Sequence, residues 1–554
     1  MSIRLRRKLI SGHEYWYAVE SVRVNGRPTT RHVAYLGRPE QMVERARGGA
    51  TETIRSHSHG AVAALKALAD RLEIAQTIDR HVPQRRAQVA SVGLTLLLAA
   101  IGRAVHPTSK RGFAQWAKLT TVEQLFKVRP DELTSAFFWD QMDKVPVATL
   151  QAIEREILAR AVREFDVRTD LLLYDTTNFF TYIASDNKRC DLPQRGKNKQ
   201  RRTDLRQLAL ALLVSRDGAV PMGSLLYRGN RNDVSVFTEA FASMRQELAA
   251  MAIEIESVTF VYDKGNVSKA NQERLENVDY VTSLVPSHHG DLLALEEATA
   301  ERLADGTAVW RSRKELWGRE RTVVMLVSEA LRLGQRQGVD QHLGKALLAL
   351  EAIRQGLLGA QRKRRREAVE QAVAKVCRGP QLRGILSADV IECAPGHYDL
   401  AESIDMERYQ WLCEHAFGRR LIVTTRDSWS TEEIVAAWRG QSHLERAFRV
   451  VKDPFHLAVR PQFHWTDQKI QVHVFCCLMG YLLGALMLRR LRGAGLNHSA
   501  RQMLDLLEEV RLATVVEHRG PGHPGRPAVR RQLEECEDHA MEVFRLFVPE
   551  ETPR

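Results

Sequence analysis

The segment 171–285 constrains the fold more than any other part of the chain. Its apolar runs have the lengths of strands and helices, and their order along the chain is typical of one kind of sheet. Three strand-like runs come first: "LLLYD" from 171, "LALALLVS" from 208 and "PMGSLLYRGN" from 221. A helical pattern at 234–251 follows, then strand-like "SVTFVYD", a short helical segment and strand-like "DYVTSLV". This order predicts a mixed α/β sheet with flanking helices.

The chain before this sheet has two segments with different hydrophobic periodicity. Residues 3–37 alternate around Asn25-Gly26, which predicts a β-hairpin. From about 60 to 165 the apolar residues recur with helical spacing, which predicts a helical unit. This unit is partly basic, and we expect it to bind DNA.

The chain after the sheet is mainly helical, with a long helical stretch at 330–376 and another helix at 465–491. The apolar run at 474–488 is shorter than the ~20 residues that span a bilayer, so we expect a buried helix and no membrane partner. The Gly/Pro/Arg-rich stretch 518–531 is typical of a flexible linker.

Charge and cysteine content narrow the partner and the compartment. Lysine and arginine exceed aspartate and glutamate by 13, which favours a polyanion such as DNA or RNA. The seven cysteines include no C-x-x-C pair, so neither a zinc finger nor a disulfide framework is expected, and a reducing cytoplasm fits.

Three acidic residues are the candidates for chemistry. Asp175 and Asp263 each close an apolar strand, and ligands gather at the carboxyl ends of strands in α/β sheets. Glu445 lies on the predicted helix "TEEIVAAWRGQSHLERAFRVVKD". The alternatives are that each Asp caps a turn and that Glu445 belongs to a solvated helix face with a salt bridge to Lys452. Carboxylates suit Mg²⁺, and two such ions ~3.5–4 Å apart can drive phosphodiester chemistry.

Several motifs occur in the order found in one family. They are "YDTTNFF", "RGKNKQRRTDLRQLALALLVSRDGAVPMGSLLYRGNRND", "VYDKGNVSKANQERL", "FGRRLIVTTRDSWSTEEIVAAWRGQSHLERAFRVVKD" and "VRPQFHWTDQKIQVHVF". The chain resembles the DDE transposases of bacterial insertion sequences over about 171–475. The resemblance implies a ribonuclease-H-like catalytic domain, with Asp175, Asp263 and Glu445 binding two Mg²⁺ ions that Mn²⁺ can replace.

The resemblance also implies contacts with DNA. This branch of the family has Tyr, Arg, Glu and Lys at fixed spacing on the glutamate helix; the chain has Trp438, Gln441, Glu445 and Lys452 there. Gln441 donates a hydrogen bond without the charge of arginine, and Trp438 can stack as tyrosine would. We expect one helix to carry all four residues.

Further residues have two interpretations each. The basic loop after the first strand, including Lys197, Lys199, Arg201 and Arg202, is a solvated charge run or a phosphate contact. Arg362–Arg366 have the same alternatives. Trp310 or Trp317 is a candidate for stacking an unpaired base. Gly265 is expected to permit a sharp turn, Ser268 and Asn271 to shape a helix start, and His464 and His473 to be core or surface residues.

The expected architecture is therefore α/β: a ribonuclease-H-like mixed sheet with flanking helices, interrupted by a large insertion and preceded by a β-hairpin and a helical domain. The expected domains are 1–58 (hairpin region), 59–168 (helical, DNA-binding), 169–286 (catalytic core), 287–420 (insertion), 421–495 (core with the glutamate helix) and 496–554 (C-terminal region).

The resemblance implies metal-dependent cleavage at the ends of a mobile element and strand transfer into target DNA. The protein would act as a homodimer on terminal inverted repeats, in the bacterial cytoplasm at the nucleoid. Two alternatives stay open: a stand-alone nuclease with the same sheet, and a DNA-binding protein that has lost catalysis.

Overall fold

A computed structural model describes the chain apart from residues 1–2, 11–12, 25–26, 40–41, 43–50, 85–88, 185, 199, 276–277, 359–363, 453–463, 519–527 and 550–554. It divides into two compact units. Unit 1 comprises residues 1–258 and 442–554, and unit 2 comprises residues 259–441.

Unit 1 contains many helices among its described residues. Its helices are α2 (Gly60–Arg71), α3 (Ile74–His81), α4 (Val92–Val105), α5 (Lys110–Lys118), α6 (Val122–Phe126), α7 (Ser135–Asp143), α8 (Val147–Phe165), α9 (Asp233–Ala250), α16 (Gln441–Lys452, all but Gln441), α17 (Asp467–Gly493), α18 (Ala500–Glu509) and α19 (Asp538–Phe547). The helical texture predicted for 60–165 is confirmed.

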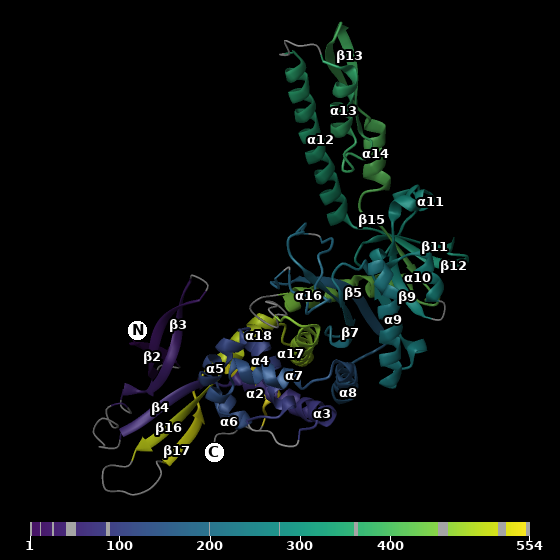
Figure 1. Cartoon of the computed structure of the whole chain (residues 1–554). Helices are drawn as coiled ribbons and strands as arrows, with labels where there is room; N and C mark the ends of the chain where they lie inside the picture. Colours follow the sequence, from purple (N-terminus) through teal and green to yellow (C-terminus); the bar gives the residue numbers. More distant parts are fainter. Residues whose placement is uncertain are drawn as a thin grey trace. The chain divides into compact units, whose positions relative to one another are not determined.

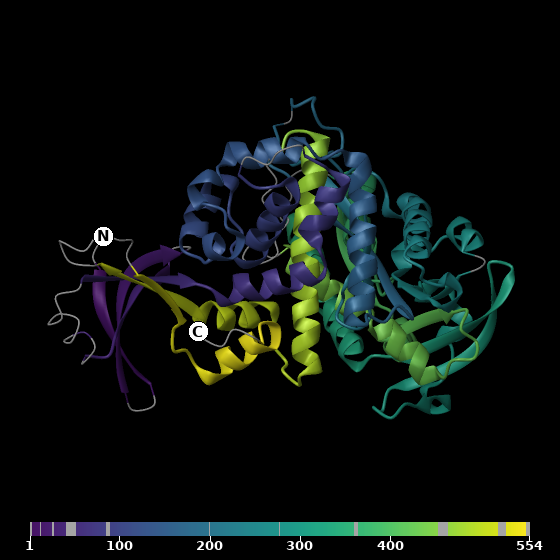
Figure 2. The same ribbon diagram turned by 90° about the horizontal axis from the view of Figure 1, so that it is seen from below.

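Helix α17 is the centre of this helical part. It packs against α4, α7 and α8, and it runs as a long yellow-green rod among the other helices of unit 1 in Figure 2. By length and composition it could cross a membrane, but 94% of its most apolar stretch is buried inside the protein. The prediction of a buried helix is confirmed.

Two small sheets of unit 1 come from the chain ends. Strands β1 (Ile3–Ile10), β2 (His13–Val24) and β3 (Arg27–Gly37) form one antiparallel sheet. Val24 pairs with Arg27, so the predicted hairpin forms, while its Asn25-Gly26 turn lies outside the described residues.

The second small sheet joins distant parts of the sequence. Strand β4 (Thr51–Ser58) pairs with β16 (Arg511–His518), which also pairs with β17 (Ala528–Leu533). The linker predicted at 518–531 was therefore wrong at both ends, where backbone groups pair across β16 and β17. Its stretch 519–527, including "PGRP" from 524, lies outside the described residues.

A third antiparallel set in unit 1 consists of β5 (Leu171–Phe180), β6 (Gln207–Ser215) and β7 (Pro221–Arg228). Every residue of β6 is buried, and its sequence is apolar without interruption from Leu208 to Val214. Helix α9 follows, so the first half of the predicted strand and helix order is confirmed.

Unit 2 contains a mixed sheet. Among its described residues the strand order is β10 (Glu301–Arg302), β11 (Ala308–Leu316), β12 (Arg319–Val327), β15 (Arg419–Thr424), β9 (Asp279–Leu284) and β8 (Thr259–Tyr262). Strands β8 and β9 are parallel and the other neighbours are antiparallel. Helix α10 (Lys269–Arg274) connects β8 to β9, which completes the predicted order.

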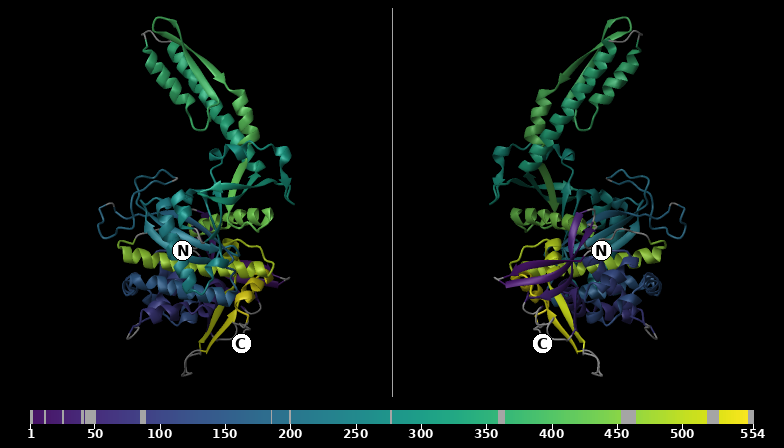
Figure 3. Two further views of the ribbon diagram at one scale, coloured as in Figure 1. Left: turned by 90° about the vertical axis from the view of Figure 1, so that its right-hand side faces the viewer. Right: turned by 90° about the vertical axis from the view of Figure 1, so that its left-hand side faces the viewer.

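An extension projects from the strands of unit 2, as Figures 1 and 3 show. It consists of α12 (Glu329–Leu358), α13 (Arg366–Cys377), the hairpin β13 (Leu386–Ala394) and β14 (His397–Ile404), and α14 (Met406–His415). Leu350, Val373 and Leu386 belong to its own apolar core. The segment expected to be an insertion thus includes both sheet strands and this extension.

Candidate active site and nucleic-acid interface

Asp175 lies within a strand and not at its end. Strand β5 continues to Phe180, and Asp175 pairs with Leu212 of β6. The prediction that Asp175 closes the strand was wrong, because the polar residues after it still pair with β6 as far as Phe180 opposite Gln207. Its half-buried carboxylate accepts a hydrogen bond from the backbone nitrogen of Thr176 at 2.7 Å.

Asp263 directly follows β8, as predicted, and its side chain is exposed. It precedes the short 3-10 turn η3 (Lys264–Asn266), yet its carboxylate makes no capping hydrogen bond there. The alternative that Asp263 caps the next turn is therefore wrong. The carboxylate is left available for another partner.

The residues after Asp263 shape the chain locally. Gly265 has no left-handed φ, so the expected sharp turn does not need a glycine. Its nearest neighbouring atom is Oδ2 of Asp263, 3.9 Å from where a Cβ would lie. Ser268 caps α10 by accepting from the Asn271 nitrogen at 3.1 Å, and Asn271 Nδ2 donates to the Asn266 carbonyl at 2.8 Å. Both residues shape the helix start as predicted.

Glu445 lies exposed on α16, but the expected single helix is divided. Helix α15 (Thr431–Arg439) begins with a capping box, in which Ser430 and Glu433 bond each other's backbone nitrogens. It ends at Gly440, and α16 starts at the next residue. Glycine is a weak helix former, which accounts for the break at this point. Trp438 therefore lies on a different helix from Gln441 and Glu445.

The three carboxylates are distributed over both units, with Asp175 and Glu445 in unit 1 and Asp263 in unit 2. Among the described residues, no three His, Cys, Asp or Glu side chains gather so as to hold a metal ion. The donor chemistry fits Mg²⁺, because two of the carboxylates are exposed oxygen donors. The triad stays a prediction.

A cavity of about 460 Å³ in unit 2 brings two of the sequence motifs together. Asp263 and Lys264 line it, as do Trp438 and Gln441, which are far away in the sequence. Four arginines that were not among the predicted site residues also line it: Arg383, Arg408, Arg419 and Arg420. Four guanidinium groups and one ammonium group give the wall a strong positive charge, which suits phosphate oxygens.

Trp438 and Gln441 have different surroundings in this cavity. The Trp438 indole nitrogen donates to Ser283 Oγ at 2.7 Å, and the Arg420 guanidinium carbon lies 5.3 Å from the ring centroid. Trp438 is thus fixed to the sheet of unit 2. The Gln441 Nε2 atom is buried and has no hydrogen-bond partner among the described residues. A buried amide donor left unpaired costs about 1–3 kcal/mol, so a bound acceptor would relieve a real penalty.

The other predicted DNA contacts are partly placed. Lys197, Arg201 and Arg202 are exposed in the loop between β5 and β6, whereas Lys199 and the Lys452 side chain lie outside the described residues. Arg202 forms a double hydrogen bond with Asp204, at 2.7 and 2.6 Å, which lowers the pKa of Asp204 to about 2. Lys197 and Arg201 are more available to a phosphate. Of the second basic run, Arg362 and Lys363 lie outside the described residues, and Arg366 pairs with Glu370 at 2.8 Å.

The two tryptophan candidates for base stacking differ in access. Trp310 is only 7% exposed, and its indole nitrogen donates to Thr299 Oγ1 at 3.0 Å. Trp317 occupies the two-residue turn between β11 and β12 with a left-handed φ of 54° and is half-buried. Trp310 therefore has a packing role, and Trp317 is the remaining candidate.

Comparisons with known proteins give distant likenesses. No protein-family model matches the chain, and no curated protein does. A solved piggyBac transposase synaptic complex with hairpin DNA matches at 8% identity and a TM-score of 0.38, covering 81% of this chain and 79% of that one. A Mos1 transposase paired-end complex with the left transposon end matches at 13% identity and a TM-score of 0.16, covering 36% and 60%. TM-scores this low do not establish a shared fold.

Proposed function

We propose that the chain is a DDE transposase with a ribonuclease-H-like catalytic core, acting on the ends of its own mobile element and on target DNA. The observation that carries this proposal is the cavity of unit 2. Two motifs about 175 residues apart in sequence supply Asp263, Trp438 and Gln441 to one basic wall. A solvated helix face or a turn cap does not account for that convergence.

Asp175, Asp263 and Glu445 would hold the metal ions. When bound, a pair of Mg²⁺ ions would activate an attacking oxygen and stabilise a leaving one. The chain's own contribution is to position the DNA strand. The arginines of the cavity and the unpaired Nε2 of Gln441 would bind phosphate oxygens and hold the scissile phosphodiester in line for attack.

Two displacements at phosphorus would follow. In the first, water attacks the phosphorus at the element end, the bond from phosphorus to the 3′ oxygen breaks, and a 3′-hydroxyl is released. In the second, that hydroxyl attacks a target phosphodiester, a new phosphorus–oxygen bond forms, and the target strand's own 3′ oxygen leaves. Neither step needs a covalent protein intermediate.

The test is a cleavage and joining assay on DNA that carries the repeats flanking the gene, with Mg²⁺ present. Asp175→Ala, Asp263→Ala and Glu445→Ala should each reduce cleavage by about a hundredfold or more, because each removes a ligand of ions that supply several kcal/mol. Glu256→Ala and Glu432→Ala, which remove exposed carboxylates elsewhere, should leave the rate unchanged.

The products separate the alternatives. Joined DNA supports a transposase, whereas cleavage without joining indicates the stand-alone nuclease. Equal activity in wild type and all three Ala variants would rule out the triad, and binding of the repeats without cleavage by wild type would favour a protein that has lost catalysis.

A further inference from the structure

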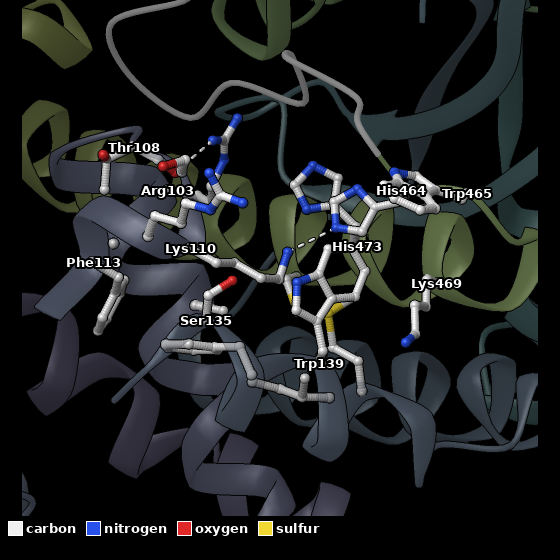
Figure 4. A pocket seen from close by; sticks show the side chains of 18 of the residues that line it. Arg103, Thr108, Lys110, Phe113, Ser135, Trp139, His464, Trp465, Lys469 and His473 are labelled. Atoms are coloured by element: carbon white, nitrogen blue, oxygen red, sulfur yellow. Dashed lines mark hydrogen bonds between the residues drawn. The ribbon is translucent and has the colours of Figure 1, made fainter. Parts of the chain in front are cut away.

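Unit 1 contains a second cavity that the proposed chemistry does not use. It measures about 720 Å³ and lies among α4, α5, α7 and α17 and the residues just before α17 (Figure 4). Cavities of a few hundred to about a thousand Å³ are the size range of small-molecule and nucleotide sites. Every residue that lines it belongs to unit 1.

The cavity has an apolar floor and aromatic walls. Leu96, Phe113, Phe138 and Met142 are among the residues that line it. The rings of His464 and His473 stack at 4.3 Å, and Trp139 lies 5.0 Å from His464. Trp465 also lines the cavity but is 63% exposed, so its indole face is open to a ligand at the mouth.

The charge of the lining is entirely positive. The cationic residues are Arg103, Lys110, Arg111, Arg189 and Lys469, and none of the described lining residues is an aspartate or glutamate. Lys469 is compensated from outside by Asp143 at 2.8 Å. Arg111 and Arg189 are exposed and have no acidic partner among the described residues. A site with several cations and no anion is suited to an anionic ligand.

Lys110 is a buried cation of this cavity that contacts two aromatic side chains. Its Nζ lies 2.7 Å from Nε2 of His464 and 4.9 Å from the Trp139 ring centroid. A dashed line in Figure 4 marks the hydrogen bond. Burial holds the pKa of His464 well below its usual value, so the imidazole is neutral and accepts from the ammonium. Burial also lowers the pKa of Lys110 to about 8. Since no carboxylate pairs with Lys110 among the described residues, its charge is buried at a cost that an anion would offset.

We propose that this cavity binds one nucleotide, with its phosphate held by Lys110, Arg111 and Arg189 and its base stacked on Trp465. Cationic side chains beside an open aromatic face are the combination that binds single nucleotides and unpaired strands. Hydroxyls of Thr108, Ser109, Ser135 and Thr466 also line the site and can bond ribose or base edges. The nucleotide comes either from a single-stranded stretch of DNA or from the free pool.

The test measures nucleotide binding by the full-length protein in EDTA, which prevents metal-dependent cleavage. Its result therefore does not depend on whether the protein cleaves DNA. The probes are a labelled ten-residue oligothymidylate, read by fluorescence polarisation, and free dTMP, read by calorimetry. For whichever probe binds, Lys110→Met and Trp465→Ala should each reduce the affinity by about tenfold. Lys110→Arg should restore most of the affinity. Arg163→Ala, which removes an exposed charge on α8, is the matched control and should change it less than twofold.

The two probes identify the source. Binding of the oligonucleotide alone assigns the site to a DNA strand, and binding of dTMP assigns it to the free nucleotide. Thermal melting of each variant verifies folding, and Lys110→Met should melt no lower than wild type because it removes a buried charge. Affinities unchanged in both Lys110→Met and Trp465→Ala would overturn the proposal. Binding of oleate by the protein, with no binding of either nucleotide probe, would also overturn the proposal.

Discussion

At the scale of single residues, the sequence identified which side chains to consider but not what surrounds them. Asp263 could be placed after its strand because an apolar run ends there. That its carboxylate is not a cap depends on hydrogen bonds, which spacing does not determine. Asp175 was placed at a strand end because polar residues follow it, yet β6 supplies backbone partners for those residues. Of the arginines around Trp438 and Gln441, Arg419 and Arg420 belong to the same motif. Arg383 and Arg408 precede that motif, and no local pattern groups them with it.

One buried carboxyl predicts a pH dependence of stability. Glu154 on α8 accepts hydrogen bonds from Ser224 of β7 at 2.9 and 3.0 Å, and burial raises its pKa to about 7. The folded protein then keeps this proton up to about pH 7, whereas the unfolded chain releases it near the ordinary glutamate pKa of 4.5. The stabilisation is therefore complete below pH 4.5 and is lost as the pH rises through 7.

Glu154→Gln should remove that dependence. Its melting temperature relative to wild type should rise between pH 5 and pH 8, by several degrees at pH 8, because the variant has no charge to bury. Differential scanning calorimetry at both pH values measures the difference. Glu432→Gln, an exposed control, should show the same offset at both. A constant offset for Glu154→Gln would contradict the assigned burial.

At the scale of elements, local patterns predicted strands and helices well where periodicity is strong. The order from β5 to β9 and the start of α15 at Ser430 both follow from apolar period and capping residues. The division between α15 and α16 did not follow, because the apolar period continues through Gly440 and only the glycine weakens the helix there. It falls where the two compact units meet in the sequence.

The capping box of α15 gives a test at this scale. Ser430→Ala removes the hydroxyl that accepts from the Glu433 nitrogen at 3.2 Å and should cost about 1 kcal/mol of unfolding free energy. Hydrogen exchange at the first turn of α15 should speed up. Ser428→Ala, in the preceding turn, removes a hydroxyl outside the cap and should have little effect. Unchanged exchange in Ser430→Ala would show that packing alone sets the start of this helix.

At the scale of the whole molecule, pairing between distant segments was beyond the sequence. Strand β4 was expected to belong to an N-terminal hairpin region, and β17 to a linker, yet both share a sheet with β16. Likewise β15 pairs with β9, although the extension of unit 2 lies between these two strands in the sequence. Alternation shows that a segment is a strand but not which strand is its partner. The expected domain boundaries and the meeting of the three carboxylates stay predictions for the same reason.

The sheet of β4, β16 and β17 predicts a coupling between the chain ends. Val515 on β16 is 1% exposed and pairs with Ile54 of β4. Val515→Asp should bury an unpaired carboxylate and cost roughly 3 kcal/mol or more, with faster hydrogen exchange in residues 51–58. Val529→Asp on β17, where the side chain is 52% exposed, should cost much less. Protected amides at 51–58 in Val515→Asp would contradict the pairing.

The same sheet can form only late in translation, because it pairs an early strand with a late one. Strand β4 leaves the ribosome early, but its partner β16 is made more than four hundred residues later. At about 5–20 residues per second the wait is on the order of tens of seconds. Throughout that time the first half of unit 1 has an unpaired strand edge and helices without α17 between them. A message cut short before β16 would therefore yield a chain open to proteases and aggregation, so intact protein should come only from complete translation.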